Sequence, residues 1–209
     1  MILFLILFTN CCAQQSFDTT GRAFTQLYGV TLEETTIEKA QSLLGSTKEY
    51  RDGDAALSSH RINYFIKKDN LYITFDAGEM GGGKRITSFR LSITPLKEKY
   101  TTNTKVFLSK TDLFGIRLGM SKYKFFKMFP NQYIMDTSKQ EYSKMDFLDR
   151  KKPDRFIYFY NKMPMKKKDI EYFHIENLQD AFYGESIDMI PTFKRDSLVK
   201  LDIGKTTSY

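Results

Sequence analysis

The sequence predicts an α+β fold of two tandem repeats, each a short helical pair packed on an antiparallel β-sheet. Three observations predict it. A short stretch occurs at 25–32 and again at 111–118, with Leu, an aromatic residue, Gly, a β-branched residue and Leu in the same order. Each copy precedes an apolar run with helical spacing. Strand-like runs with alternating apolar residues then follow, and repetition on this scale decides the architecture.

A second correspondence lies later in each half of the chain. The stretch 84–93, KRITSFRLSI, is echoed by 194–203, KRDSLVKLDI. Because the two correspondences occur in the same order, we use them to divide the mature chain. This gives a first repeat over 24–94, a linker over 95–105 and a second repeat over 106–209.

The chain opens with an apolar run of eight residues, which is shorter than the roughly 20 residues that a membrane-spanning helix needs. Small and polar residues follow the run, as in an export signal. The sequence therefore predicts a signal peptide over 1–13 and a polar lead-in over 14–23. Cys11 and Cys12 also stand where a lipid is attached in lipoproteins, so lipid anchoring is the alternative to plain export.

The composition indicates a folded, basic protein. Hydrophobic residues make up 41% of the chain and aromatic residues 15%, which is typical of a chain with a packed core. The formal net charge of +7 favours acidic partners, and an exported protein meets acidic proteins or an anionic membrane surface rather than nucleic acid. Both cysteines precede the predicted cleavage point, so the mature domain must be held together by its core.

Each repeat contains one clear helix signal. In the first repeat, Thr35 or Thr36 can cap a helix over 37–44, whose apolar residues share one face. In the second repeat, Ser121 is the expected cap before the apolar run 123–129. A glycine closes the first run and a proline the second, because both residue types interrupt helices.

The sheet is predicted from runs in which apolar and polar residues alternate. Such runs cover 62–67, 71–76 and 86–93 in the first repeat. The second repeat has a clear run at 156–160, and the run 169–177 fits either a strand or a helix. A period of two is typical of an antiparallel sheet with one buried and one wet face.

Three stretches lack such a pattern. The stretch 46–60 is rich in turn residues, and insertions at 131–153 and 178–193 lengthen the second repeat relative to the first. Long loops without secondary structure of their own are uncommon unless they are functional or disordered. We therefore expect both insertions to be segments that contact a partner.

Several motifs that resemble ligand sites lack a required part. The stretch 78–84 matches G-x-x-x-x-G-K, but Arg follows the Lys and a strand pattern replaces the helix, so a hairpin turn is expected. His60 and His174 are isolated, which argues against a zinc site. Asp52 and Asp54 lack the rest of a calcium-binding loop, and no serine lies in a G-x-S-x-G elbow. The sequence therefore predicts no catalytic residues, no cofactor and no metal.

The repeated opening carries a resemblance to a known family. The residues 115–121, GIRLGMS, and the matching 29–32, GVTL, each precede an apolar helix, and the first helix is closed by glycine. This pattern resembles the small outer-membrane assembly lipoproteins of the SmpA/OmlA type and the tandem units of the β-lactamase inhibitor protein family. The resemblance implies a helical pair on an antiparallel sheet whose wet, often concave face binds protein. Pro130, in place of a second closing glycine, departs from the pattern.

Together these observations predict a non-enzymatic, exported cell-envelope protein that binds another envelope protein through its open sheet face. It is expected in the periplasm or secreted, with attachment to the outer membrane by a lipid as the alternative. A second hypothesis is an inhibitor or immunity protein that blocks a secreted or periplasmic enzyme. The basic run Lys166–Lys168 is a further candidate for contact with anionic headgroups.

The predicted contact site follows from the strand alternation. If Ile73 and Leu91 point to the helices, their chain neighbours point to the wet face of the sheet. Tyrosine and arginine dominate interface energetics, which makes this face the candidate binding site, with an ordinary solvated face as the alternative. Its predicted residues are Tyr72, Thr74, Arg90, Tyr158, Tyr160 and Lys200.

Overall fold

The computed structural model describes residues 21–53, 59–78, 84–96, 100–102, 113, 115–129, 133–135, 156–165 and 182–208. The predicted signal peptide with Cys11 and Cys12, the basic run 166–168 and the ambiguous run 169–177 lie outside the described residues.

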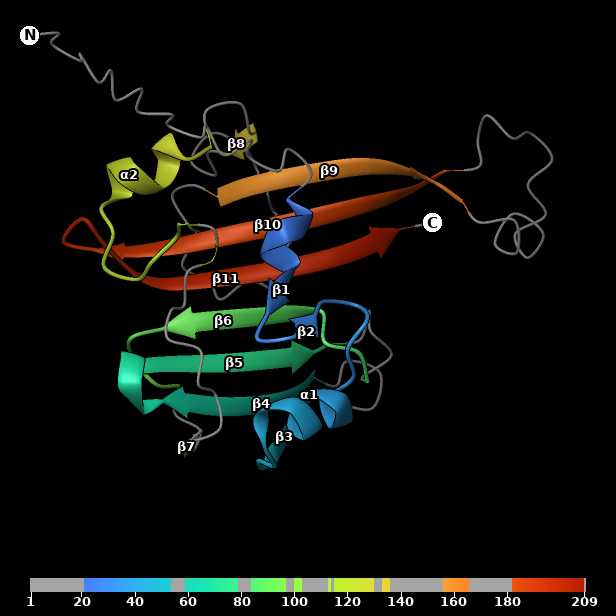
Figure 1. Cartoon of the computed structure of the whole chain (residues 1–209). Helices are drawn as coiled ribbons and strands as arrows, with labels where there is room; N and C mark the ends of the chain where they lie inside the picture. The colour runs from blue at the N-terminus through green and yellow to red at the C-terminus, as the bar shows by residue number, and fades with distance from the viewer. Residues whose placement is uncertain are drawn as a thin grey trace, which may run out of the picture.

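In the part of the chain that the structure describes, nine strands form a single sheet (Figure 1). Eight of them follow one another in the spatial order β3 (Glu49–Asp52), β4 (Ser59–Ile66), β5 (Leu71–Ala77), β6 (Ser88–Ser92), β11 (Ser197–Ser208), β10 (Phe182–Lys194), β9 (Phe156–Pro164) and β8 (Tyr133–Met135). All neighbours in this order are antiparallel, and the short β7 (Thr101–Thr102) pairs in parallel with β4.

Helices and turns cover one face of this sheet. These elements are the 3-10 helix η1 (Arg22–Thr25), the hairpin of β1 (Gln26–Leu27) and β2 (Val30–Thr31), and the α-helices α1 (Ile37–Leu44) and α2 (Lys122–Lys127). A second 3-10 helix, η2 (Lys67–Asp69), joins β4 to β5. Among the described residues, no helix has the length and apolar character needed to cross a membrane.

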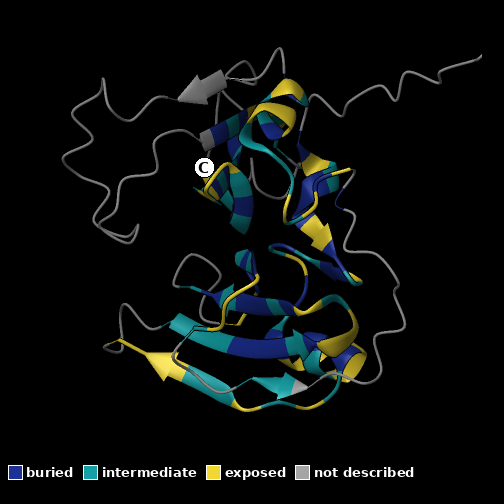
Figure 2. Cartoon of the chain, turned by 90° about the vertical axis from the view of Figure 1, so that its left-hand side faces the viewer, coloured by how far each residue is buried: buried dark blue, intermediate teal, exposed yellow. Residues whose placement is uncertain are grey.

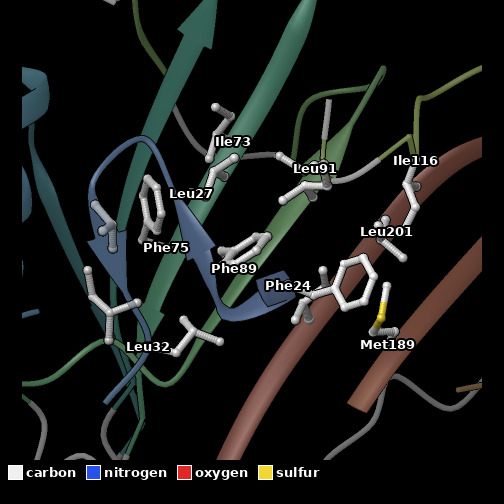
Figure 3. Close-up of a cluster of buried hydrophobic side chains, with 14 of the residues drawn as sticks. Phe24, Leu27, Leu32, Ile73, Phe75, Phe89, Leu91, Ile116, Met189 and Leu201 are labelled. Carbon is white, nitrogen blue, oxygen red and sulfur yellow. The ribbon is translucent and has the colours of Figure 1, made fainter. Parts of the chain in front are cut away.

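The core lies between these elements and the sheet. Along the strands, buried residues alternate with less buried ones (Figure 2), so one face supplies the core. Figure 3 shows side chains from the N-terminal hairpin meeting those of β5, β6, β10 and β11. The residues labelled there, which are all buried, are Phe24, Leu27, Leu32, Ile73, Phe75, Phe89, Leu91, Ile116, Met189 and Leu201.

The predicted α+β fold class is wrong. Strands predominate in the described residues, and each half has one α-helix rather than a helical pair on the sheet. The opening stretch 25–32 forms the end of η1 and the tight β1–β2 hairpin, because Gly29 takes a φ of 80° that turns the chain back on itself. The apolar residues of this stretch therefore enter the core from a hairpin.

The local helix signals are confirmed. Thr36 caps α1, and its hydroxyl oxygen accepts a hydrogen bond from the Lys39 backbone N–H at 3.2 Å. Gly45 follows the last helical residue with a φ of 101°. Ser121 caps α2 in the same way as Thr36 caps α1, with the Lys124 N–H 3.3 Å from its hydroxyl. The strand predictions in the first half also agree with β4, β5 and β6, to within a few residues.

The predicted loops conceal three strands. The insertion 178–193 is largely β10, and β8 lies within the insertion 131–153. The turn-rich stretch 46–60 contains β3 and the start of β4. In β10, Pro191 lies beyond Met189, where pairing with β9 ends, and a proline is tolerated where a strand has a single neighbour.

Three backbone hydrogen bonds tie the start of α1 to the chain just before β6. The Glu33 N–H donates to the Ile86 carbonyl at 2.6 Å. The Ile86 N–H donates to the Thr35 carbonyl at 2.9 Å. The Ile37 N–H donates to the Lys84 carbonyl at 3.0 Å. These bonds fix the position of the helix relative to the last strand of its half.

The same three bonds occur at the start of α2. The Gly119 N–H donates to the Leu198 carbonyl at 2.7 Å, and the Leu198 N–H donates to the Met120 carbonyl at 2.9 Å. The Lys122 N–H donates to the Asp196 carbonyl at 3.0 Å. The two halves of the described chain, before and after β7, therefore share a backbone frame that joins helix to sheet.

The halves meet at the centre of the sheet, where β6 pairs with β11. Leu91 lies opposite Leu201, and these two residues occupy the same position in the matched stretches 84–93 and 194–203. Each half contributes four strands to the order, and in both halves these strands follow the chain from the edge of the sheet to its centre. The hydrogen bonds at the two helix starts match Ile86 with Leu198, which shifts the correspondence in the sequence by two residues, so an approximate twofold axis would pass through the Arg90–Asp202 pair.

Candidate functional site

The sheet face opposite the helices is called the outer face here. Its side chains alternate along the strands with those of the core. The outer face is defined by Arg61, Asn63, Phe65, Tyr72, Thr74, Asp76, Ser88, Arg90, Ser92, Lys200, Asp202, Gly204, Ser186, Asp188, Ile190, Tyr158 and Tyr160. All six predicted contact residues lie on this face.

A charged cluster stands at the centre of the outer face, on the junction of β6 and β11. The Arg90 Nε donates to an Asp202 carboxylate oxygen at 2.5 Å, and the Lys200 Nζ lies 3.2 Å from the other oxygen. The three side chains are between 23% and 29% exposed. Two cations share one carboxylate, so the cluster carries a net positive charge and is partly open to solvent.

A second polar group lies toward the β3 edge. The Ser59 hydroxyl donates to the Asp76 carboxylate at 2.7 Å, and the Arg61 Nη2 donates to Asp52 at 3.0 Å. The Arg61 Nε is 4.0 Å from Asp76. The charged side chains of this group are therefore paired largely with one another.

The end of the outer face over β4 and β5 is covered by the chain itself. Thr74 is only 5% exposed and donates to the Asn63 side-chain oxygen at 2.9 Å. The Tyr100 hydroxyl lies 3.4 Å from Thr74, and its ring meets Tyr72 edge-on with centroids 4.9 Å apart. Tyr72 also stacks on Phe65 at 4.6 Å. Tyr100 belongs to the predicted linker and covers these two side chains, so Tyr72 and Thr74 are less accessible than alternation alone implies.

The opposite end of the outer face carries the predicted tyrosines. Tyr160 is 61% exposed, and its ring lies over Gly184, where an added Cβ would come within 2.8 Å of the tyrosine hydroxyl. Tyr158 is half-buried and lies opposite Asp188 in the strand register. Burial raises the pKa of Asp188 to about 6. The structure thus leaves Tyr160 as the most exposed of the six predicted residues.

Asp188 and Asp202 belong to the outer face but were not among the predicted residues. Asp202 alternates with the buried Leu201 and Ile203, so strand periodicity could have found it. Asp188 lies between the buried Ile187 and Met189, a signal that was obscured because the stretch was expected to be a loop.

Among the described residues, no three His, Cys, Asp or Glu side chains come together in a way that could hold a metal ion. The His60 Nδ1 lies 2.5 Å from a Glu49 carboxylate oxygen, on the helix side of the β3–β4 pair. His174 and Asp54 lie outside the described residues.

Comparison of the chain with protein-family models, with characterised proteins and with solved structures finds no match.

Proposed function

We propose that the protein is a non-enzymatic, exported cell-envelope protein that binds another protein through its outer face. The observation that carries the proposal is the combination of the partly exposed Arg90–Asp202–Lys200 cluster with the largely exposed Tyr160, on a sheet face opposite the helices (Figure 1). The site is centred on β6 and β11 and extends to β9.

The chemistry of this face suits a protein partner. Arginine and tyrosine supply much of the binding energy in interfaces, because they combine large contact areas with hydrogen-bonding groups. The net positive charge at the cluster favours an acidic segment on the partner, since complementary charge speeds association and fixes orientation. Tyr72 and Thr74 lie at the covered end of the face, where Thr74 is the cross-strand neighbour of Arg90.

The export part of the proposal rests on the sequence. The apolar start of the chain followed by Cys11, Cys12 and Ala13 supports a periplasmic or secreted protein. Mass spectrometry of the mature protein should find Gln14 at the N-terminus, or a lipid on Cys11 or Cys12. An intact Met1 on protein from the cytosol would contradict export.

The binding face is tested by capture of partners from an envelope extract with the wild type and with a Tyr160→Ala, Lys200→Ala double variant. We expect the variant to lose about 2 kcal/mol of binding free energy while its thermal midpoint stays nearly unchanged. Tyr123→Ala is the matched control, because Tyr123 is 71% exposed on α2, away from the outer face.

Two results of the capture decide against parts of the proposal. Equal capture by the wild type and the double variant would show that the outer face is not the site. Capture of one hydrolytic enzyme, with loss of its activity when this protein is added, would identify an inhibitor that uses the same face.

A further inference from the structure

A basic surface lies at one corner of the molecule, on the helix side. It is formed by α2, the turn before it and the hairpin that joins β10 to β11. We call it the basic corner, and its cations, all exposed apart from the half-buried Lys122, are Arg117, Lys122, Lys124, Lys127, Lys194 and Arg195. Asp196 is the one acidic residue in the segments 115–129 and 193–197.

Backbone contacts hold the parts of the basic corner together. Ser121 forms an isolated bridge with Ser197, and the Lys122 N–H donates to the Asp196 carbonyl. The ring of Phe126 lies 6.0 Å from that of Phe193, at the end of β10. The cations of α2 and those of the hairpin therefore occupy one rigid surface.

An exposed aromatic residue stands among these cations. Tyr123 is 71% exposed, and the Lys127 Nζ lies 5.8 Å from the centre of its ring. Lysine side chains around a tyrosine are typical of surfaces that contact lipid headgroups, because the ring sits at the interface and the ammonium groups bind phosphates.

The scaffold itself does not require two of these charges. Where α2 has Lys122 and Lys127, the matched positions of α1 hold Ile37 and Ser42. The backbone hydrogen bonds at the two helix starts are the same. Lys122 and Lys127 are therefore additions to a frame that forms without them, whereas Lys124 matches Lys39 of α1.

The N-terminal end of the described chain enters the fold beside α2. The ring of Phe24 lies 5.7 Å from that of Phe129, just after the helix. Between the apolar run and Gly21 stand 12 residues, which span at most roughly 40 Å when extended. A lipid on Cys11 or Cys12 would lie within this reach of the basic corner, and stable attachment to a bilayer typically needs two such signals.

We propose that the basic corner binds the anionic headgroups of a phospholipid bilayer, with Tyr123 in the headgroup layer. Binding in this way directs the helix side toward the membrane and leaves the outer face for a protein partner. The inference uses different residues from the proposed function and does not depend on it.

The test is sedimentation of the full chain with vesicles of phosphatidylcholine alone and of phosphatidylcholine with phosphatidylglycerol. The triple variant Lys124→Glu, Lys127→Glu, Lys194→Glu should lose about tenfold or more of the preference for anionic vesicles. That preference should also weaken with salt in the wild type, because salt screens exposed charges.

The matched control is Lys39→Glu, Lys67→Glu, Lys68→Glu, which changes the net charge equally at exposed positions of the first half. We expect it to retain most of the preference. Tyr123→Ala changes no charge and should weaken binding a few-fold. Equal binding of the wild type to both vesicles, or equal losses in both triple variants, would overturn the proposal and leave an acidic protein as the partner of this corner.

Discussion

The helices of the two halves occupy matched places on the sheet and bury residues of very different size. Ala40 on α1 and Phe125 on α2 are both fully buried. The Phe125 ring packs against those of Phe129 and Phe193, with centroids 5.4 Å and 5.7 Å away. Since the hydrogen bonds at the two helix starts are nevertheless alike, the backbone frame fixes where each helix sits, and neighbouring side chains adjust to the volume that remains.

The strands of the two halves differ in length, and ionic contacts stabilise the part by which the second pair is longer. β10 and β11 have 13 and 12 residues, whereas β5 and β6 have 7 and 5. On the helix side of the longer pair, Glu185 accepts a hydrogen bond from Arg22 at 2.8 Å and lies 3.0 Å from the Lys205 Nζ. Glu33 receives hydrogen bonds from the backbone and hydroxyl of Thr207. Ionic contacts therefore replace apolar packing where the second half extends beyond the first.

The largest expected effect concerns the aromatic packing of the second half. Phe125→Ala should lower the free energy of unfolding by about 3–5 kcal/mol, because it leaves a cavity among three other aromatic rings. Denaturation with urea measures the loss. Tyr123→Ala, on the same helix but 71% exposed, should change stability by less than about 0.5 kcal/mol. Similar losses in the two variants would mean that α2 does not bury Phe125 as described.

The ionic contacts of the extension should make stability depend on acid pH. Burial acts to raise the pKa of Glu185, but hydrogen bonds from Arg22 and Lys205 outweigh it and lower the pKa. A lowered carboxyl pKa gives stability that is present above the unfolded value and lost as the pH falls through the folded one. Glu185→Gln should cost about 2 kcal/mol at neutral pH, after allowance for the exposure of Arg22.

The cost of Glu185→Gln should shrink progressively below about pH 4, the usual range of a glutamate. Urea unfolding of both proteins across the acid range measures this. A cost that stays constant with pH would show that the carboxylate charge is not what the network stabilises.

Asp188, which lies opposite Tyr158, should make stability depend on pH in the opposite direction from Glu185. Burial raises the pKa of Asp188 to about 6, so its contribution is favourable below the unfolded pKa and is lost as the pH rises through 6. Asp188→Asn should therefore stabilise the protein by about 1–2 kcal/mol at pH 8, and the gain should vanish in acid. Unfolding of the variant and the wild type at several pH values checks the sign, and a destabilised variant at pH 8 would contradict it.

The smallest expected effect on stability concerns the hydroxyl groups that cap the two helices. Thr36→Ala and Ser121→Ala should each cost about 1 kcal/mol, because each removes the hydroxyl that caps its helix. Thermal unfolding of the two variants gives the values. Losses that differ by more than about 1 kcal/mol would show that the two helix starts are not equivalent.

Short-range signals were enough to predict both helices and, in the first half, the strands β4, β5 and β6. Thr36, Gly45 and Ser121 act within a turn or two of the chain, so their effects are visible in the sequence. The matched stretches 84–93 and 194–203 paired Leu91 with Leu201, whereas the hydrogen bonds at the helix starts match Ile86 with Leu198 and so shift this correspondence by two residues. That the two leucines face each other across the central strand pair required the structure.

Contacts between distant segments were the part that the sequence could not reveal. β10 was taken for a loop because Gly184, Glu185 and Pro191 interrupt its apolar alternation, and Glu185 is buried only because Arg22 and Lys205 reach it. The predicted site was likewise incomplete. Asp202, the partner of Arg90, and Tyr100, which covers Thr74, are both distant in sequence from the residues that they contact.

The central claim is that the outer face contacts a protein while the helix side does not. A photo-crosslinking amino acid in place of Tyr160, on the outer face, is compared with the same amino acid in place of Tyr123, on α2; both positions are well exposed. Irradiation of cells followed by gel analysis should give a discrete protein adduct from position 160 and none from position 123. An adduct from position 123 alone, or no adduct from position 160, would contradict the claim.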